Sequence, residues 1–334
     1  MEVTNKVLVS ILIPCFNAER WVAQAIESAL SQTWAEKEII VVDDGSQDGS
    51  LDSIKSFGDQ IRWETGLNRG GNVARNRLLD LARGEWLQYL DADDYLLPSK
   101  IERQVSFLRD HPTCDVVYSP VLLVNWSEHI VEQEVTPIRE PRDPWILLAR
   151  WWLPQTGGPL WRRQAIINAG GWKPDQPCCQ EHELYLRLLQ SGAEFCYFDE
   201  CHAAYRNWSQ DGTVSKRNRA EVRRQRLAIE ERAERFLESR GELTRSRLQA
   251  LNQARFEIAR MTWLEDRAAA AEIVFEIEER QPGFVPELPA ARGRYRWIYR
   301  IFGFSAAERF AGFKRRLTGG DRRLIPVSRS PDHA

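Results

Sequence analysis

The chain has 334 residues, of which 43% are hydrophobic and 10% aromatic, and its formal net charge is −2. This length and apolar content suit about two globular domains, and the near-neutral charge argues against a protein that binds nucleic acid with its whole surface. No apolar run approaches the roughly 18–20 residues of a membrane span, and no signal-peptide pattern begins the chain, so we expect a cytoplasmic protein. The six cysteines form no Cys-x-x-Cys pair, which favours buried free thiols over zinc ligands or disulfides.

The first hundred residues predict strands and helices in alternation. Continuous apolar runs, typical of strands buried on both faces, are separated by segments of helical periodicity, and Asn17 is the expected N-cap of the first helix. In chain order we expect strands at 7–13, 38–42, 61–65 and 85–90, and helices after Asn17, at 48–57 and at 70–82. This order predicts an α/β fold with a mostly parallel central sheet flanked by helices. Its strands end at one edge, where ligands bind in such folds.

The remainder of the chain divides into a mixed part and a helical part. We expect helices at 100–109 and 182–190 and strands at 115–118, 121–126 and 194–198. Beyond residue 217 the composition shifts to Arg, Glu and Ala with helical periodicity. The sequence therefore predicts a first domain of residues 1–217, with halves at about 7–98 and 99–217, and a helical C-terminal extension of residues 218–334.

Three carboxylates, Asp91, Asp93 and Asp94, follow the fourth predicted strand. They repel one another and are costly to desolvate unless a cation neutralises them. In extended backbone Asp91 and Asp93 share one face, and a divalent ion held between carboxylate and phosphate oxygens is the arrangement expected of Mg²⁺ or Mn²⁺. A solvated acidic turn would have the same composition. Polar residues also follow the first two strands, at Asn17 and Asp43-Asp44, which favours a binding site at this edge.

Several short motifs follow one another along residues 9–214. They are Ile13-Pro14-Cys15-Phe16-Asn17, Ser31-Gln32-Thr33, Val42-Asp43-Asp44-Gly45-Ser46, Asn68-Arg69-Gly70-Gly71, Leu90-Asp91-Ala92-Asp93-Asp94, Gly170-Gly171-Trp172, Gln180-Glu181-His182-Glu183 and Tyr205-Arg206. In this order they resemble the family 2 inverting glycosyltransferases, which have the nucleotide-diphospho-sugar fold called GT-A. The resemblance implies a metal-dependent inverting enzyme that moves a sugar from a nucleotide-diphospho-sugar, most naturally a UDP-sugar, to a hydroxyl acceptor. Such an enzyme would act in polysaccharide, lipid-linked glycan or glycoconjugate synthesis.

The resemblance also implies roles for single residues of the donor site. Asp44 would accept a hydrogen bond from the nucleobase, and residues 14–17 would line the base and ribose. Asp91 would contact ribose or sugar hydroxyls, and Asp93 would bind a Mn²⁺ or Mg²⁺ ion on the diphosphate. Arg75 would brace Asp91 or a phosphate, with an ordinary surface arginine as the alternative. The candidate substrate-binding residues are Pro14, Cys15, Asn17, Asp44, Arg75, Asp91 and Ala92.

Transfer to a hydroxyl also requires a general base that removes the acceptor's proton. In the family this is a carboxylate, usually an Asp preceded by a second acid, before an amphipathic helix. At that place Glu181 falls on the base position, preceded by Gln180. Glu183 is the competing candidate, although helical spacing favours its pairing with Arg187. We interpret His182 as a partly buried helix residue rather than a proton relay.

A second departure from the family follows Tyr205-Arg206, where many members carry a His near the metal and this chain has Asn207. The ion would then be held by Asp93, phosphates and water alone. Two other functions remain open: a catalytically silent module that binds sugar nucleotides, and a nucleotidyltransferase. The latter is disfavoured because no Gly-rich basic loop follows the first strand, and the absence of Gly-x-Gly-x-x-Gly disfavours a nicotinamide enzyme.

The segment 292–316 combines Arg and Lys with aromatic residues. This pattern is typical of an interfacial helix that binds anionic lipid through its charge and apolar face. It would bring the enzyme to a lipid-linked acceptor through peripheral contact at the inner face of a membrane. The alternative is a helical pair that simply packs on the catalytic domain, with Arg and aromatic residues interdigitating.

Overall fold

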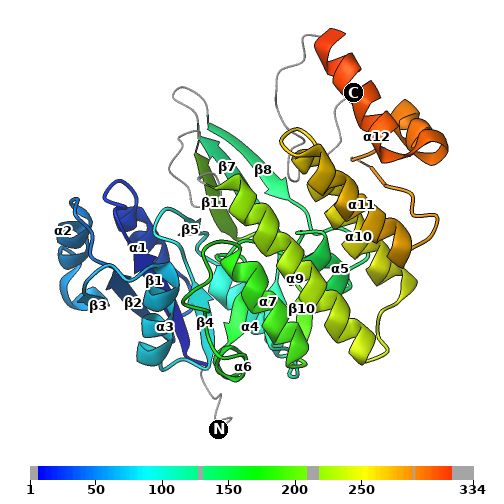
Figure 1. Ribbon diagram of the computed structural model, residues 1–334. Helices are drawn as coiled ribbons and strands as arrows, with labels where there is room; N and C mark the ends of the chain where they lie inside the picture. The colour runs from blue at the N-terminus through cyan, green and yellow to red at the C-terminus, as the bar shows by residue number, and fades with distance from the viewer. Residues whose placement is uncertain (1–6, 127–130, 209–217, 289, 318–334) are drawn as a thin grey trace. The chain divides into compact units, whose positions relative to one another are not determined.

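The computed structural model describes residues 7–126, 131–208, 218–288 and 290–317. The chain divides into two compact units. The first contains residues 1–144 and 153–222, and the second contains residues 145–152 and 223–334 (Figure 1).

The first unit contains the predicted alternation of strands and helices. Its elements in chain order are β1 (Val9–Cys15), α1 (Val22–Leu30), β2 (Lys37–Asp43), α2 (Ser50–Lys55), the 3₁₀ helix η1 (Gly58–Gln60), β3 (Arg62–Thr65), α3 (Gly71–Leu81), β4 (Trp86–Tyr89), β5 (Tyr95–Leu96), α4 (Lys100–Leu108), β6 (Val116–Tyr118), β7 (Val121–Trp126), β8 (Val131–Thr136), β9 (Leu160–Arg162), α6 (Arg163–Asn168), α7 (Gln180–Gln190), β10 (Phe195–Tyr197) and β11 (Ala203–Trp208).

Seven strands form the central sheet, in the order β10-β6-β9-β4-β1-β2-β3. β1 lies parallel to β4 on one side and to β2 on the other, with Leu12 opposite Tyr89 and Cys15 opposite Asp43. Of the described strands in this sheet, β9 alone runs antiparallel to its neighbours. The predicted mostly parallel sheet is therefore confirmed. Since β4, β1 and β2 are adjacent and parallel, their carboxyl ends meet at one edge.

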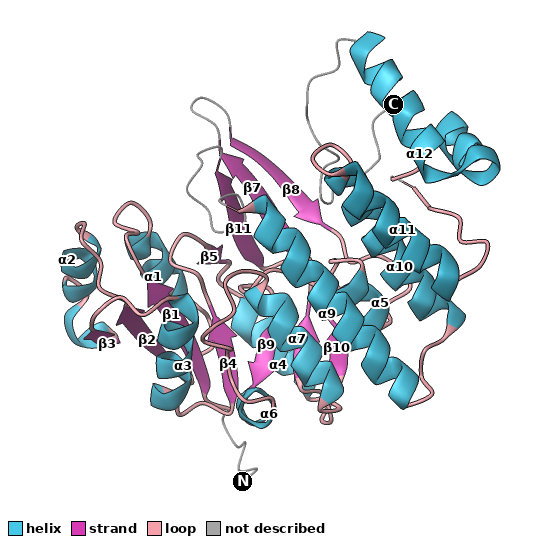
Figure 2. Ribbon diagram, viewed as in Figure 1, coloured by secondary structure: helices cyan, strands magenta, loops and turns pink. Residues whose placement is uncertain are grey.

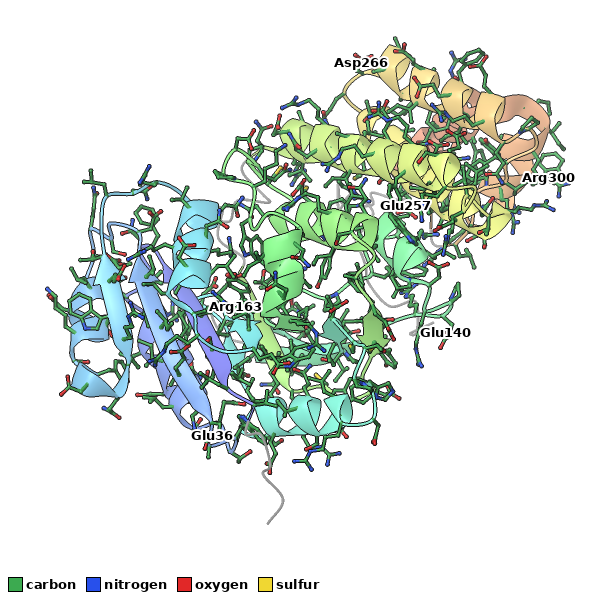
Figure 3. The ribbon with its side chains drawn as sticks, turned by 90° about the horizontal axis from the view of Figure 1, so that it is seen from below. Glu36, Glu140, Arg163, Glu257, Asp266 and Arg300 are labelled. Carbon is green, nitrogen blue, oxygen red and sulfur yellow. The ribbon has the colours of Figure 1, made fainter. Side chains whose placement is uncertain are left out.

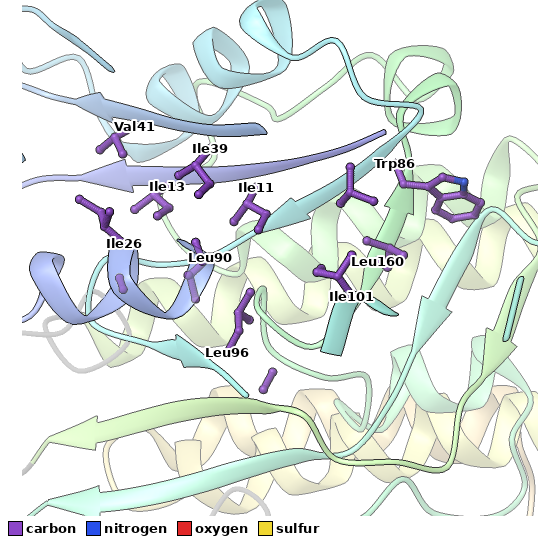
Figure 4. Packing of buried hydrophobic residues seen from close by; sticks show 14 of the residues in the cluster. Ile11, Ile13, Ile26, Ile39, Val41, Trp86, Leu90, Leu96, Ile101 and Leu160 are labelled. Atoms are coloured by element: carbon purple, nitrogen blue, oxygen red, sulfur yellow. The ribbon is translucent and has the colours of Figure 1, made fainter. Parts of the chain in front are cut away.

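Apolar residues cover both faces of this sheet. Ile11, Ile13, Ile39 and Val41 alternate along β1 and β2 and pack on one face against Ile26 of α1 (Figure 4). The residues between them along these strands are equally buried, and α3 also packs on β1 and β2. A strand buried on both faces explains the continuous apolar runs in the sequence.

A second sheet of four strands, in the order β5-β11-β7-β8, is an addition that the sequence did not predict. Only β7 was expected as a strand. β11 pairs with β7 along Ala204–Trp208 and with β5 at Ala203 and Ala204, close to the acidic turn that follows β4.

The prediction that Asn17 caps the first helix is wrong. α1 begins at Val22 with Trp21 at the N-cap position. Asn17 instead has a left-handed φ of 48°, and its Oδ1 accepts a hydrogen bond of 2.8 Å from the backbone N–H of Gln47. Its own N–H donates to Ser46 Oγ at 2.9 Å, so Asn17 joins the loops that follow β1 and β2.

The second unit consists of helices in its described residues (Figure 2). They are α5 (Pro144–Ala149), α9 (Arg219–Ser239), α10 (Arg245–Thr262), α11 (Arg267–Arg280) and α12 (Gly293–Leu317). The boundary between the units falls inside two of them, so that α5 belongs to the second unit from Trp145 and α9 from Arg223. Gly303, with a φ of 78°, divides α12 into two helical parts. Throughout the described part of the chain, no helix combines the length and apolarity needed to cross a bilayer.

The aromatic residues of α12 fall into two groups. Tyr295, Tyr299 and Phe304 are buried and surround Phe256 of α10, with ring centroids 5.4–6.3 Å apart. Others, including Trp297, are exposed. The segment 292–316 therefore packs against helices of its own unit along one side and keeps an exposed aromatic side.

Candidate active site

Asp91, the first carboxylate after β4, is held by Arg75 of α3. Arg75 Nη2 lies 2.7 Å from Asp91 Oδ1, and the guanidinium lies over the ring of Trp172 at 4.9 Å. Burial lowers the pKa of Arg75, but the charges of Asp91 and Glu181 outweigh burial and raise it. Arg75 therefore braces Asp91 as a charged side chain, and the alternative of a surface arginine is wrong because the residue is buried.

Asp93 lies next to this ion pair without sharing it. Within the described residues no side chain forms an ion pair with the Asp93 carboxylate. Burial and the charge of Asp91 raise the pKa of Asp93 to about 6. The carboxylate is thus half-buried among like charges and has a free energy to gain from a cation.

Arg206 of β11 fixes the backbone of this acidic turn. Its Nη1 donates to the carbonyl oxygen of Asp93, and its backbone N–H donates to Asp94 Oδ1 at 2.8 Å. The guanidinium lies over the rings of Trp21 and Tyr95, at 4.4 and 4.8 Å from their centroids. Arg206 therefore orders the turn through main-chain contacts and leaves the Asp93 side chain for another partner.

The carboxylates of this site fit a divalent cation only if oxygen atoms of a bound ligand complete its coordination. Among the described residues no group of three or more His, Cys, Asp or Glu side chains could hold a metal ion by itself. A single carboxylate without a cationic partner suits Mg²⁺ or Mn²⁺ when phosphate and water oxygens complete the shell. Asp93 is the residue that would hold such an ion.

The remaining residues of the donor side lie after β1 and β2. Asp44 is buried, and its two carboxylate oxygens accept the N–H groups of Arg69 and Gly70, each at 2.8 Å. Asp44 thus shapes the loop that leads into α3, and its contact with a nucleobase stays a prediction. Cys15 is buried, and burial together with Asp43 raises the pKa of its thiol to about 12. Pro14 and Asn17 lie beside it at the end of β1, and Ala92 is buried within the acidic turn.

The two candidate bases near the start of α7 have different environments. Glu183 is buried, and Arg187 Nε and Nη2 lie 2.8 and 2.7 Å from its Oε2, as the helical spacing predicted. Glu181 is half-buried, and its Oε1 accepts a hydrogen bond of 2.6 Å from Thr156 Oγ1. His182 is buried, in agreement with its interpretation as a helix residue. Because Glu183 is occupied by Arg187, Glu181 is the better candidate base.

The carboxylates of the acidic turn and of Glu181 all affect the pKa of the Tyr205 phenol. Burial raises the pKa of Tyr205 far above its ordinary value, and the charges of four carboxylates raise it further. These carboxylates belong to Asp94, Glu181, Asp93 and Asp91. Side chains of the turn after β4, of α7 and of β11 therefore lie within range of one another's charges, although they are far apart in the sequence.

The position after Tyr205-Arg206 holds no substitute for the family's His. Asn207 Nδ2 donates to Asn125 Oδ1 at 2.8 Å and so joins β11 to β7. His202, which precedes β11, places its Nε2 2.8 Å from Glu200 Oε2. Sequence reasoning missed the contributions of Thr156 and of the Arg206 side chain. The sequence features that could have indicated them were a Thr in a Gly- and Pro-rich connection, for Thr156, and an Arg inside a strand, for Arg206.

Residues 10–158 match the sequence profile of Glycosyl transferase family 2. An uncharacterized glycosyltransferase of Haemophilus influenzae is 34% identical over 139 residues, which cover 38% of this chain and 56% of that protein. The glucosyltransferase WfaP of Escherichia coli, named for UDP-Glc and α-D-GlcNAc-diphosphoundecaprenol, is 39% identical over 103 residues, which cover 30% of this chain and 41% of WfaP. The chain thus spans about half, or less, of the length of the curated relatives it matches.

Solved structures share the fold at low sequence identity. TarS 1-349 of S. aureus in complex with UDP-GlcNAc superposes with a TM-score of 0.55 at 15% identity, over 81% of this chain and 90% of that one. The mannosyltransferase PcManGT of Pyrobaculum calidifontis, in complex with GDP-Man and Mn²⁺, gives a TM-score of 0.51 at 16% identity, over 95% and 89%. These likenesses confirm the expected GT-A type of α/β fold. Residues 10–158 are thus similar in sequence to the family 2 glycosyltransferases, and the chain shares the fold of solved glycosyltransferases.

Proposed function

We propose that the chain is a metal-dependent inverting glycosyltransferase that uses a nucleotide-diphospho-sugar, with UDP-sugars favoured, and a hydroxyl acceptor. The observation that carries the proposal is the Arg75–Asp91 ion pair of 2.7 Å, which leaves the neighbouring Asp93 carboxylate outside any ion pair among the described residues. These residues provide carboxylates for a donor, and Glu181, held by Thr156, provides a separate carboxylate for an acceptor. The UDP-sugars in the names of WfaP and of the TarS complex support the choice of donor.

The chemical step needs one proton acceptor and one stabilised leaving group. The acceptor oxygen forms a bond to the anomeric carbon as the bond from that carbon to the nucleoside diphosphate breaks, and the hydroxyl proton passes to Glu181. Attack opposite the leaving group inverts the anomeric configuration. Asp91, fixed by Arg75, would orient donor hydroxyls, and Asp93 would hold the divalent ion, which when bound neutralises the diphosphate.

The test combines donor binding with product analysis. The full chain is screened by thermal shift against UDP-, GDP- and dTDP-sugars with and without Mn²⁺, since a ligand of the native state raises apparent stability. Release of nucleoside diphosphate is then measured with hydroxyl acceptors that include a diphosphoundecaprenol-linked GlcNAc. NMR of the product should show inversion. Retention contradicts the mechanism, and donor binding without transfer to any acceptor favours the silent binding module.

We further propose that α12 brings the enzyme to an anionic membrane surface, where a lipid-linked acceptor would lie. Trp297, Ile301 and Phe302 are each more than half exposed, and Trp297 and Phe302 contact each other with ring centroids 6.1 Å apart. Arg294, Arg296 and Arg300 are exposed on the same helical turns, and Arg300 extends outward from α12 (Figure 3).

No exposed acid offsets these charges on α12. Glu308 is the one acidic residue in the sequence of this helix, and it is buried. Its Oε1 accepts hydrogen bonds from Arg260 Nε at 2.5 Å and from Tyr295 Oη at 2.8 Å. An exposed surface of Arg and large apolar side chains without carboxylates has the chemistry of an interfacial helix.

Vesicle flotation tests this second proposal. The full chain should float with vesicles of phosphatidylglycerol and phosphatidylcholine and remain behind with phosphatidylcholine alone. The double variant Trp297→Ser and Ile301→Ser should lose most of the flotation, whereas Phe275→Ser, an exposed Phe on α11, should behave as wild type. Equal flotation of all three proteins removes the membrane proposal.

A further inference from the structure

We propose that Thr156 is a positioning residue for Glu181, and that the loop of residues 154–158 is anchored on two sides so that Thr156 can hold the Glu181 carboxylate. The proposal rests on the proposed function, in which Glu181 is the base. It adds a residue to which neither the family match nor the motifs give a role.

The contact between the two side chains is short and shielded. Thr156 Oγ1 donates to Glu181 Oε1 at 2.6 Å, and Thr156 is 1% exposed. A hydrogen bond to a charged carboxylate is stronger than one between neutral groups. The bond occupies Oε1 and leaves Oε2 to accept the proton of an acceptor hydroxyl. It also removes rotamer freedom from a long side chain, which a base at a fixed distance from the reacting oxygen requires.

A second bond joins the same loop to the same helix. Tyr185 Oη donates to the carbonyl oxygen of Pro154 at 3.1 Å, and Tyr185 is fully buried. Tyr185 follows Glu181 by four residues, so the two lie on one side of α7, one turn apart. The loop is therefore docked along α7 at two points, and Thr156 cannot move away from Glu181 without breaking the Pro154 contact.

On its other side the loop is held by buried amides from β4 and α4. Gln88 Nε2 donates to the carbonyl oxygen of Gly157 at 2.9 Å, and Gln104 Nε2 donates to that of Gly158 at 3.3 Å. Lys100 Nζ donates to the side-chain oxygens of both glutamines and thereby orients the two amides.

This anchor places strongly polar side chains in the protein interior. Gln88 and Lys100 are fully buried, and burial lowers the pKa of Lys100 well below its ordinary value. Burying such groups is unfavourable unless each hydrogen bond is made. Gly158 is also closely packed, because a Cβ there would meet Pro154 Cβ at 2.8 Å and Val121 Cγ1 at 2.9 Å. The network holds one short loop in one place, and the side chain which that loop presents to α7 is Thr156.

The experiment compares three substitutions of Thr156 in the full chain. Thr156→Val keeps the shape and removes the hydroxyl, and we expect kcat for transfer to fall about 10- to 100-fold, with donor KM and the donor-induced thermal shift unchanged. Thr156→Ser restores the hydroxyl and should recover at least a third of wild-type kcat. Thr156→Ala, which cannot clash, should match the valine variant and serves if the latter fails to fold.

Two further variants separate positioning from general damage. Thr33→Val removes a Thr–Glu hydrogen bond of the same length, 2.6 Å to Glu102 Oε2, at an exposed place outside this loop and should transfer sugar at the wild-type rate. In a Glu181→Gln background, Thr156→Val should cause no additional loss, because a residue that acts through Glu181 has nothing left to position. The proposal is overturned if Thr156→Val retains wild-type kcat, if serine fails to rescue, or if the two losses multiply.

Failure of the proposed function would look different. If the wild type binds a donor but transfers no sugar to any acceptor, the assignment of an enzyme fails. Crystal structures of the wild type and of Thr156→Val then still test the contact. We expect a single Glu181 rotamer in the wild type and a displaced carboxylate in the variant, and an unmoved Glu181 contradicts the positioning role.

Discussion

Arg75 and Asp91 form an ion pair of 2.7 Å between α3 and the acidic turn, with side chains only 10% and 25% exposed. The pair neutralises Asp91 and does not include Asp93, two residues further on. Two neighbouring aspartates of one motif therefore have different electrostatic environments. The first is fixed for contact with donor hydroxyls, and the second retains a carboxylate for a cation.

Removal of the Arg75 guanidinium should cost stability as well as activity. Arg75→Ala leaves Asp91 partly buried beside Asp93 and Asp94, and we expect the free energy of unfolding to fall by about 2–4 kcal/mol. Urea denaturation followed by circular dichroism measures the change.

Arg77 provides the matched control on the same helix. It pairs with Glu64 at 2.7 Å, but the pair lies at the surface. Exposed ion pairs contribute little to stability, so Arg77→Ala should unfold at the same urea concentration as wild type. Equal losses in the two variants would contradict the structural role assigned to the Arg75–Asp91 pair.

The raised pKa of Asp93, about 6, predicts a pH dependence of cation binding. Burial and Asp91 oppose its ionisation, while Arg206 and Arg75 favour it. A divalent ion binds the ionised carboxylate, so the apparent affinity for Mn²⁺ in the presence of UDP should fall about tenfold per pH unit below 6 and level off above it. Isothermal titration calorimetry between pH 4.5 and 8 measures this profile.

The raised pKa of Asp93 also affects the free energy of unfolding of the metal-free protein. This effect has the opposite sign to that of an Asp whose pKa is lowered by a salt bridge. Because the folded pKa is higher than the ordinary one, the folded chain binds the proton more tightly. The contribution of Asp93 is therefore fully present below about pH 4 and is lost as the pH rises through 6. Asp93→Asn should remove this part of the pH dependence, and an unchanged profile in that variant would count against the assignment.

Glu181 and Glu183 should respond differently to the same substitution. Glu181→Gln should bind donor as wild type does and lose transfer, because an amide cannot take the acceptor's proton. Glu183→Gln should lower the midpoint of thermal unfolding, since it leaves Arg187 without its charged partner in a buried site. Differential scanning fluorimetry and a transfer assay distinguish the two. Undiminished transfer by Glu181→Gln would require another base.

The sequence predicted the central sheet well because its signals are local. Continuous apolar runs identify strands buried on both faces, and four-residue spacing on a helix was enough to expect the Glu183–Arg187 pair. The edge at which Asp91 and Asp93 lie follows from the parallel order of the strands alone.

Features that depend on a distant partner were not predictable in this way. Asn17 has the residue type of an N-cap, but its side chain binds the loop at Gln47. The strand β11 is one of four strands in the second sheet, and nothing in the sequence indicated that it would pair with β7. On α12, helical periodicity did not indicate which aromatic residues would pack against Phe256. Thr156 became visible only once the loop was placed against α7.

Calorimetric titration of UDP-sugar in the presence and absence of Mn²⁺, with wild type and Asp93→Asn, tests the central claim most directly. We predict that Mn²⁺ strengthens donor binding to the wild type at least tenfold and leaves binding to Asp93→Asn unchanged, while Asp93→Asn unfolds at no lower temperature than the wild type. Equal strengthening by Mn²⁺ in the two proteins would contradict the claim that Asp93 holds the cation on the donor diphosphate.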